Sequence, residues 1–211
     1  SFKYPSGITS DGTNLYVADT DNNMIRKIVI STGEVTTLAG YAGSSGSTDG
    51  MGTAASFYSP FAITIDGTNL YVADTQNQLI RQIEISSGVV TTLTGTVGAS
   101  GSMDGSSMEA KFNGPVGITT DGTNLYVSEW SNHTIRKVVI STGVVTTLAG
   151  TAGTSGTTDA TGTAAKFKNP NGLIIEGSNL YVADYNNFTI RQINLVGDTV
   201  NFRVDFADAA G

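Results

Sequence analysis

The chain contains no cysteine and a single histidine, His133, among its 211 residues. The lack of cysteine excludes a disulfide framework, a zinc–thiolate site and a cysteine nucleophile. One histidine cannot supply the several imidazole ligands that a zinc lyase needs. The sequence also lacks a G-x-S-x-G motif, a P-loop and a dinucleotide-binding fingerprint. We therefore predict that the chain is not an enzyme.

Charge is also scarce, and basic residues are the scarcer kind. Charged residues make up 14% of the chain, and 11 Lys and Arg against 18 Asp and Glu give a net charge of −7. Nucleic acids and anionic membranes attract basic patches, so we expect neither as a partner. No apolar run approaches the ~20 residues that span a bilayer. Gly, Ser, Thr and Asn are abundant instead, and they predict a neutral, hydroxyl-rich surface.

The four prolines are 55 residues apart, and leucines and arginines keep the same period. A fixed period in this range is typical of a propeller, a solenoid or another repeat array. Each copy of such a repeat needs its neighbours to bury its apolar face, so we expect one domain over residues 1–211. Its repeats are 1–55, 56–110, 111–165 and 166–211.

The first copy reads as four short β-strands. Their expected ranges are Gly7–Ser10, Leu15–Ala18, Ile25–Ile30 and Glu34–Ala39. Turn-forming residues separate the runs, which predicts four antiparallel strands. Four-stranded units at such a period are propeller blades, so the expected fold is all-β with four blades.

A linker of about twenty residues, 40–59, follows the first set of strands and recurs in the next two copies. Linkers of this length are uncommon in compact domains unless they carry function or pack as a unit. Residues 53–57 are expected to form one helical turn. A phenylalanine lies near the end of each linker, and one stands at the matching place near the start of the chain. We expect all four to be buried between blades: Phe2, Phe57, Phe112 and Phe167.

Three stretches of the first copy resemble the NHL repeat. They are Pro5-Ser6-Gly7-Ile8, Leu15-Tyr16-Val17-Ala18-Asp19 and Asn22-Asn23-Met24-Ile25-Arg26, against the patterns P-x-G-I, I/L-Y-V-A-D and N-N-x-I. Residues 49–57 resemble the D-G-x-G-x-x-A-x-F insertion of long bacterial and archaeal NHL repeats. The resemblance implies a β-propeller, most often six-bladed. Many such domains bind proteins or RNA, and a few are lyases.

The chain departs from that family in having four repeats and in losing the linker motif after the last one, where residues 205–211 do not restart the pattern. Terminal repeats that change character usually cap an array. A closed four-bladed ring is therefore favoured, and a segment of a larger propeller is the alternative.

Two sets of acidic residues recur with the period. The acid that ends the L-Y-V-A-D run has an arginine seven residues later in every copy, which predicts a salt bridge inside each blade: Asp19, Asp74, Glu129 and Asp184. A second set either caps its own Asp-Gly turns or forms a carboxylate ring that suits calcium: Asp11, Asp66, Asp121 and Glu176. No other cofactor is expected.

The loops after the second strand differ between copies. Copies three and four carry aromatic or imidazole side chains that the first two lack: Trp130, His133, Tyr185 and Phe188. Aromatic residues are enriched at binding hot spots, so we predict that these four form a binding patch, with packing between blades as the alternative. His133 could also pair with Glu129 in lyase-like chemistry. Asn132 and Asn187 fit the N-x-[ST] glycosylation pattern.

These features predict a non-enzymatic propeller, extracellular or on the cell surface. It would bind a protein or a glycan, or act as a structural module that can self-assemble. The alternative is a propeller enzyme, a lyase or a calcium-dependent hydrolase, with its site at the mouth of the channel.

Overall fold

The computed structural model describes residues 1–196 and 199–204, with backbone only for 199–204. Residues 205–211, where the repeat pattern was expected not to restart, lie outside the described part. The first blade consists of β1 (Pro5–Ser10), β2 (Asn14–Asp19), β3 (Met24–Val29) and β4 (Val35–Ala39), hydrogen-bonded in that order. All of the neighbouring strands are antiparallel. The expected strands are thus present, with ends that differ by at most two residues.

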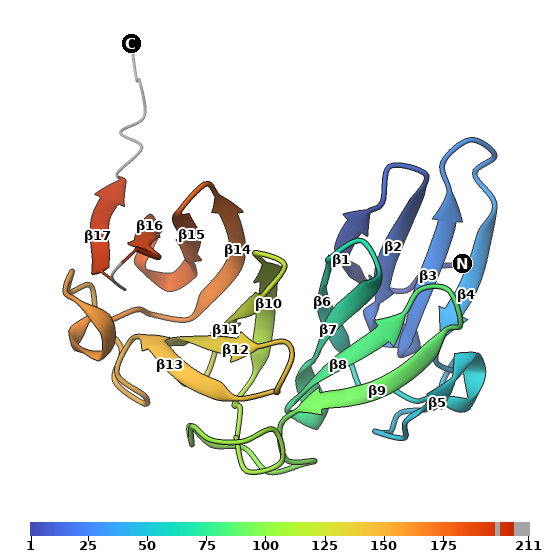
Figure 1. Cartoon of the computed structure of the whole chain (residues 1–211), viewed down its shortest axis with the longest axis horizontal. Helices are drawn as coiled ribbons and strands as arrows, with labels where there is room; N and C mark the ends of the chain where they lie inside the picture. Colours follow the sequence, from blue (N-terminus) through green and yellow to red (C-terminus); the bar gives the residue numbers. More distant parts are fainter. Residues whose placement is uncertain (197–198, 205–211) are drawn as a thin grey trace.

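The other three blades repeat this arrangement (Figure 1). Their strands are β6 (Pro60–Ile65), β7 (Asn69–Asp74), β8 (Leu79–Glu84) and β9 (Val89–Thr94); β10 (Pro115–Thr120), β11 (Asn124–Glu129), β12 (Thr134–Val139) and β13 (Val145–Ala149); and β14 (Pro170–Glu176), β15 (Asn179–Asp184), β16 (Thr189–Asn194) and β17 (Thr199–Val204). The all-β propeller class and the four blades of four strands are confirmed. Within residues 1–196 and 199–204, no helix has the length and apolar character needed to span a bilayer.

The linkers pack against the blades that follow them. After the first blade, β5 (Gly50–Met51) pairs with β9 and becomes a fifth strand at the outer edge of the second blade. The short 3-10 helix η2 (Gly52–Ala54) comes next and overlaps only the first two residues of the helical turn expected at 53–57; η4 (Gly162–Ala164) is its counterpart before the fourth blade. The linkers are therefore built into the fold.

The core lies in three clusters, one at each junction between consecutive blades. The strand alternation explains why: Tyr16 and Ala18 point to one face of the first blade, and Val17 points to the other. Phe57, Phe112 and Phe167 are fully buried in the three clusters, as the sequence predicted. The prediction is wrong for Phe2, which is 36% exposed because no blade covers it.

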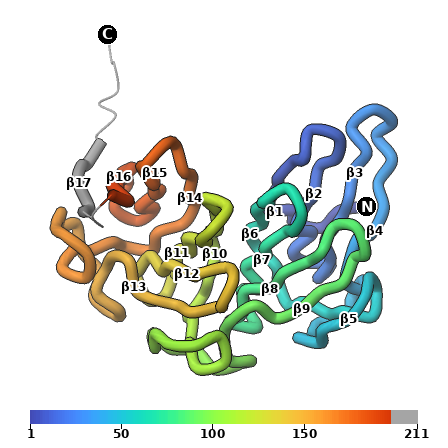
Figure 2. Tube along the Cα trace, in the orientation of Figure 1, coloured from blue at the N-terminus to red at the C-terminus, as the bar shows by residue number. Residues whose placement is uncertain are grey.

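The innermost strands β1, β6, β10 and β14 line a central cavity of about 320 Å³. They pack in sequence, β1 on β6, β6 on β10 and β10 on β14, and the trace follows an arc (Figure 2). No comparable packing joins β14 to β1 among the described residues.

Three glycines at one position of the repeat show that the arc is open. A Cβ on Gly7 or Gly117 would collide with the backbone of the next blade, at 2.7 and 2.1 Å, whereas a Cβ on Gly172 would meet no described atom within 4 Å. The favoured closed ring is therefore wrong for this chain. Equal repeats do not fix closure, because closure also requires the turn between successive blades to add up to a full circle.

Candidate functional site

A buried arginine holds each linker to its blade. In the second blade, Arg81 Nη1 lies 2.9 Å from Asp74 Oδ2, and Arg81 Nη2 lies 2.8 Å from Asp49 Oδ1. The guanidinium carbon lies 5.1 Å from the centre of the Phe57 ring. The third and fourth blades repeat the arrangement with Arg136 and Arg191. The predicted salt bridges are present in all four blades, so these acids serve the scaffold.

We call the buried arginine and its two acids the clamp. Sequence reasoning missed the second acid of the clamp, which comes from the linker. The signal was available, because Asp49, Asp104 and Asp159 follow the 55-residue period. The acid that ends the second strand of each blade is buried. Burial raises the pKa of Asp74 to about 6, although hydrogen bonds from Asn77 and the Tyr58 amide and the charge of Arg81 oppose the shift. Burial likewise raises the pKa of Glu129 and Asp184.

The second set of repeated acids, which lies at or directly after the end of the first strand of each blade, does not form a metal site. Asp11 Oδ1 accepts hydrogen bonds from the backbone N–H groups of Thr13 (2.8 Å) and Asn14 (2.6 Å), and its Oδ2 accepts one from the Tyr16 hydroxyl (2.8 Å). The hydrogen bond from the Asn14 side-chain amide is the largest cause that lowers the pKa of Asp11, and the bonds above lower it further. Asp66 and Asp121 make the same bonds.

The carboxylate-ring hypothesis for Asp11, Asp66, Asp121 and Glu176 is therefore wrong. Throughout the described ranges, no group of three or more His, Asp or Glu side chains is placed to hold a metal ion. Both carboxylate oxygens of each aspartate accept hydrogen bonds from groups in or next to its own turn, which is the alternative that the sequence left open.

The structure gives His133 a role between blades. His133 has φ +61°, a left-handed conformation that it shares with Asn23, Gln78 and Phe188 at the same repeat position. The Asn23 side chain accepts a hydrogen bond from Ser59 N, Gln78 from Gly114 N, and His133 Nδ1 from Asn169 N at 3.1 Å. In each case the donor belongs to the next blade. His133 is thus an inter-blade acceptor, and burial lowers its pKa, which keeps the imidazole neutral.

Trp130 and Tyr185 are the two predicted patch residues that the structure brings together. Their ring centroids are 5.4 Å apart at an interplanar angle of 49°. Trp130 is half-buried and Tyr185 is 57% exposed. The equivalent Thr20 and Thr75 instead donate hydrogen bonds to the carbonyls of Pro60 and Pro115 in the next blade. The fourth predicted residue, Phe188, lies at the open end of the array and makes no ring contact in the described structure.

The amide nitrogens of the two glycosylation patterns are already bonded. Asn132 is buried, and its Nδ2 donates to Gly101 O at 2.8 Å and to Glu129 Oε1 at 2.9 Å. Asn187 Nδ2 donates to Gly156 O and Asp184 Oδ2. A glycan on either nitrogen would break the contact between loop and linker, so the folded chain does not offer these asparagines as acceptors. The same bonds place the linkers beside the aromatic loops.

No protein-family model matches the chain. A comparison with curated proteins does find relatives. The chain is 38% identical over 136 residues to human NHL repeat-containing protein 2, a match that covers 60% of this chain and 19% of that protein. The chain thus spans about a fifth of the length of the curated relatives it matches.

Solved structures share the fold. An auxiliary nutrient binding protein from Bacteroides ovatus superposes with a TM-score of 0.70 at 18% identity, over 91% of this chain and 48% of that one. Virginiamycin B lyase from Staphylococcus aureus superposes with a TM-score of 0.60 at 19% identity, over 92% and 53%. At such identities the superpositions establish the architecture and leave the activity open.

Proposed function

Since the chain is a propeller built from NHL repeats, we propose that it is a non-enzymatic binding module, and that the Trp130–Tyr185 pair is its contact site. The module would act outside the cell or on its surface and bind a protein or a glycan. The observation that carries the proposal is a pair of contacting aromatic rings, Trp130 half-buried and Tyr185 exposed, where the scaffold itself uses threonine.

The surroundings of the pair suit a neutral, polar partner. Asn169 Nδ2 donates to the Trp130 carbonyl at 2.8 Å, and Asn186 Nδ2 donates to Asn169 Oδ1 at 2.8 Å. These bonds fix the loop that carries the rings, so little conformational entropy is lost on binding. Aromatic side chains with polar neighbours concentrate binding energy at interfaces.

The non-enzymatic part of the proposal rests on what the polar side chains already do. His133 bonds the next blade through Nδ1, and Glu129 is engaged by Arg136, Thr134 and Asn132. These residues are therefore better explained as scaffold than as an acid–base pair. The alternative of a lyase or hydrolase at the channel mouth is supported by the shared fold alone.

Trp130 is the only tryptophan, so its fluorescence reports on this site. We expect one or more neutral oligosaccharides or surface proteins from a panel to shift or quench that emission in a saturable way. In a Trp130→Phe protein, which keeps an aromatic ring, binding measured by calorimetry should persist in weakened form. In Trp130→Ala it should fall by about tenfold or more, as for a hot-spot residue.

The matched control is Tyr58→Ala, which removes an exposed tyrosine from the linker between the first and second blades. It should bind like the wild type. Binding that survives Trp130→Ala in a protein with an unchanged melting temperature would contradict the proposed site.

A further inference from the structure

Each blade has two different faces. The leading face contacts the preceding blade and carries the repeated phenylalanine and the Val of the second strand. The trailing face contacts the following blade and carries the Tyr of that strand and the small residue two positions later, which is Ala or, in the third blade, Ser128. Every internal junction buries one trailing face against one leading face. The structure shows this junction three times and leaves one face of each kind uncovered.

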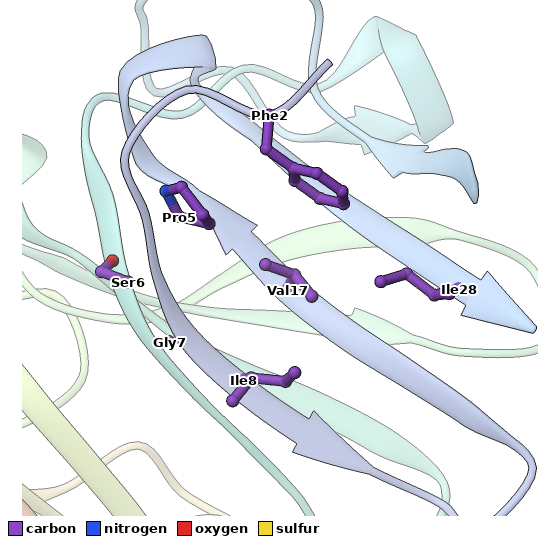
Figure 3. Close-up of a pocket in the computed structure, with 7 residues that line it drawn as sticks. All are labelled: Phe2, Pro5, Ser6, Gly7, Ile8, Val17 and Ile28. Carbon is purple, nitrogen blue, oxygen red and sulfur yellow. The ribbon is translucent and has the colours of Figure 1, made fainter. Parts of the chain in front are cut away.

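The uncovered leading face belongs to the first blade. Phe2, Ile8, Val17 and Ile28 line an apolar pocket of about 290 Å³, and Figure 3 shows their side chains along one side of the sheet. Ile8 is 59% exposed, whereas Ile63 and Ile118 at the same position are 6% exposed. The chain therefore exposes apolar surface here that its other blades bury.

The uncovered trailing face belongs to the fourth blade. Gly172, Ile174, Tyr181, Ala183 and Ile190 line a second apolar pocket, of about 280 Å³. Ile174 is 62% exposed, and it replaces a threonine that the other three copies have: Thr9, Thr64 and Thr119. The terminal blade is thus more apolar on its exposed face than the scaffold requires.

The inter-blade acceptor position changes in the same sense. At the internal junctions, Asn23, Gln78 and His133 bond the backbone of Ser59, Gly114 and Asn169. At the ends, the corresponding residues are Phe188, which is 91% exposed, and Tyr4, which is 77% exposed. The positions that form a hydrogen bond between blades inside the chain are therefore occupied by two exposed aromatic rings at its ends.

We propose that the occupant of each open face is a second copy of this chain, with the trailing face of the fourth blade packed on the leading face of the first blade of the next copy. The packing would follow the three internal junctions, with β14 against β1 of the second copy and Phe188 against its Tyr4. The faces are complementary because the same repeat already buries their counterparts. This assembly does not depend on what the Trp130–Tyr185 pair binds.

Because the two faces differ, the contact is head-to-tail. Such contacts form a ring when the rotation closes and an open array when it does not. Each copy would use both faces, and blocking either one should stop growth.

The test is the mass of the protein by light scattering after size exclusion, from low micromolar to hundreds of micromolar. We expect masses that rise above 21.8 kDa, the mass of one chain. Ile8→Arg on the leading face and Ile174→Arg on the trailing face should each weaken association by about tenfold or more. Both side chains are exposed, so both variants should keep the melting temperature of the monomer. Met108→Arg, at an exposed linker methionine, is the matched control and should associate like the wild type.

Mixing the two blocked variants gives the sharpest readout. Ile8→Arg keeps an intact trailing face and Ile174→Arg an intact leading face, so an equimolar mixture should form a dimer and grow no further. A wild type that stays monomeric at the highest concentration would overturn the proposal. So would association that neither variant weakens, or an Ile174→Arg protein that associates by itself as well as the wild type.

Discussion

Phe112 and Phe2 occupy the same position of the repeat but differ in burial, and the difference predicts their contributions to stability. Phe112 fills the junction between the second and third blades beneath Arg136, whose guanidinium carbon lies 5.3 Å from the ring centre. Phe112→Ala should lower the free energy of unfolding by about 3–5 kcal/mol, the usual cost of emptying a buried phenylalanine site. Phe2→Ala is the matched control and should cost under about 1 kcal/mol. Urea titrations of both variants test this, and similar losses for the two would contradict the junction assignment.

Sequence reasoning succeeded at residues whose role depends on identity and failed at those whose role depends on one atom. The plug phenylalanines and the Arg–acid pairs keep the same residue type or charge in every copy, so periodicity alone identified them. Asn23, Gln78 and His133 share only an acceptor atom and a left-handed backbone. His133 therefore looked like a functional addition in the sequence, whereas the scaffold explains it.

At the scale of elements, one aspartate in each linker joins that linker to the buried arginine of its blade. Asp104 Oδ1 accepts hydrogen bonds from Arg136 Nη2 (2.6 Å) and Thr147 Oγ1 (3.0 Å), and its Oδ2 accepts one from Thr147 N (3.0 Å). Asp104→Ala should release this linker and make limited proteolysis within residues 96–113 faster. The loss of global stability should be modest, about 1 kcal/mol, because Asp104 is half-exposed.

Asp21→Ala is the control for that prediction, since the Asp21 side chain makes a 3.7 Å surface ion pair with Lys3 and its backbone bond to Lys3 survives the substitution. It should leave the cleavage rate of the linker unchanged. An Asp104→Ala protein that is cut no faster than the wild type, or that is cut first in another segment, would show that backbone pairing holds the linker without the clamp.

At the scale of elements, sequence reasoning predicted every strand of the first blade but not the details of its loops. Strand ends were close because turn residues mark them, as with Gly12 at φ +85° after Asp11. The sequence identified the segment after β2 only as a loop, whereas in the structure Thr20–Asn22 forms a 3-10 turn that ends at Asn23 in the left-handed region. Its acceptor partner is 36 residues away, which a local pattern does not reveal.

At the scale of the whole molecule, closure was the feature that the repeat could not predict. Identical units give the same junction whether they form a ring or an arc, and the outcome depends on the angle between successive blades. At the end of the array the fourth blade has no following blade packed on it, as the glycine series at 7, 117 and 172 shows.

The pH dependence of stability is also a property of the whole molecule, because it sums two opposing sets of carboxylates. Burial raises the pKa of Asp74 to about 6, from an ordinary value of 3.8, and raises the pKa of Glu129 and Asp184. A carboxyl with a raised folded pKa contributes stability that is full below its unfolded pKa and is lost as the pH rises through the folded pKa. For Asp74, stability should therefore increase as the pH falls from 7 towards 4.

Asp11, Asp66 and Asp121 act in the opposite direction: burial raises the pKa of Asp66 and Asp121, but their hydrogen bonds together outweigh it, and hydrogen bonds led by the Asn14 side chain lower the pKa of Asp11. Their contribution is present above the unfolded pKa and is lost as the pH falls below about 4. Burial lowers the pKa of His133, so the stability that its neutral imidazole contributes is likewise lost as the pH falls below the ordinary pKa of 6.5. A His133→Gln background keeps a hydrogen-bond acceptor and removes that effect.

In the His133→Gln protein, calorimetric scans should give a melting temperature that rises between pH 7 and about pH 5 and falls below about pH 4. Asp74→Asn resembles the protonated acid, and adding it should reduce the rise while keeping the fall. If the melting temperature instead drops steadily from pH 7 to 5, the clamp carboxylates titrate at or below their ordinary values. The attraction of the arginines would then outweigh the cost of burying the charge, and Asp74→Asn should in that case destabilise the protein most strongly at neutral pH.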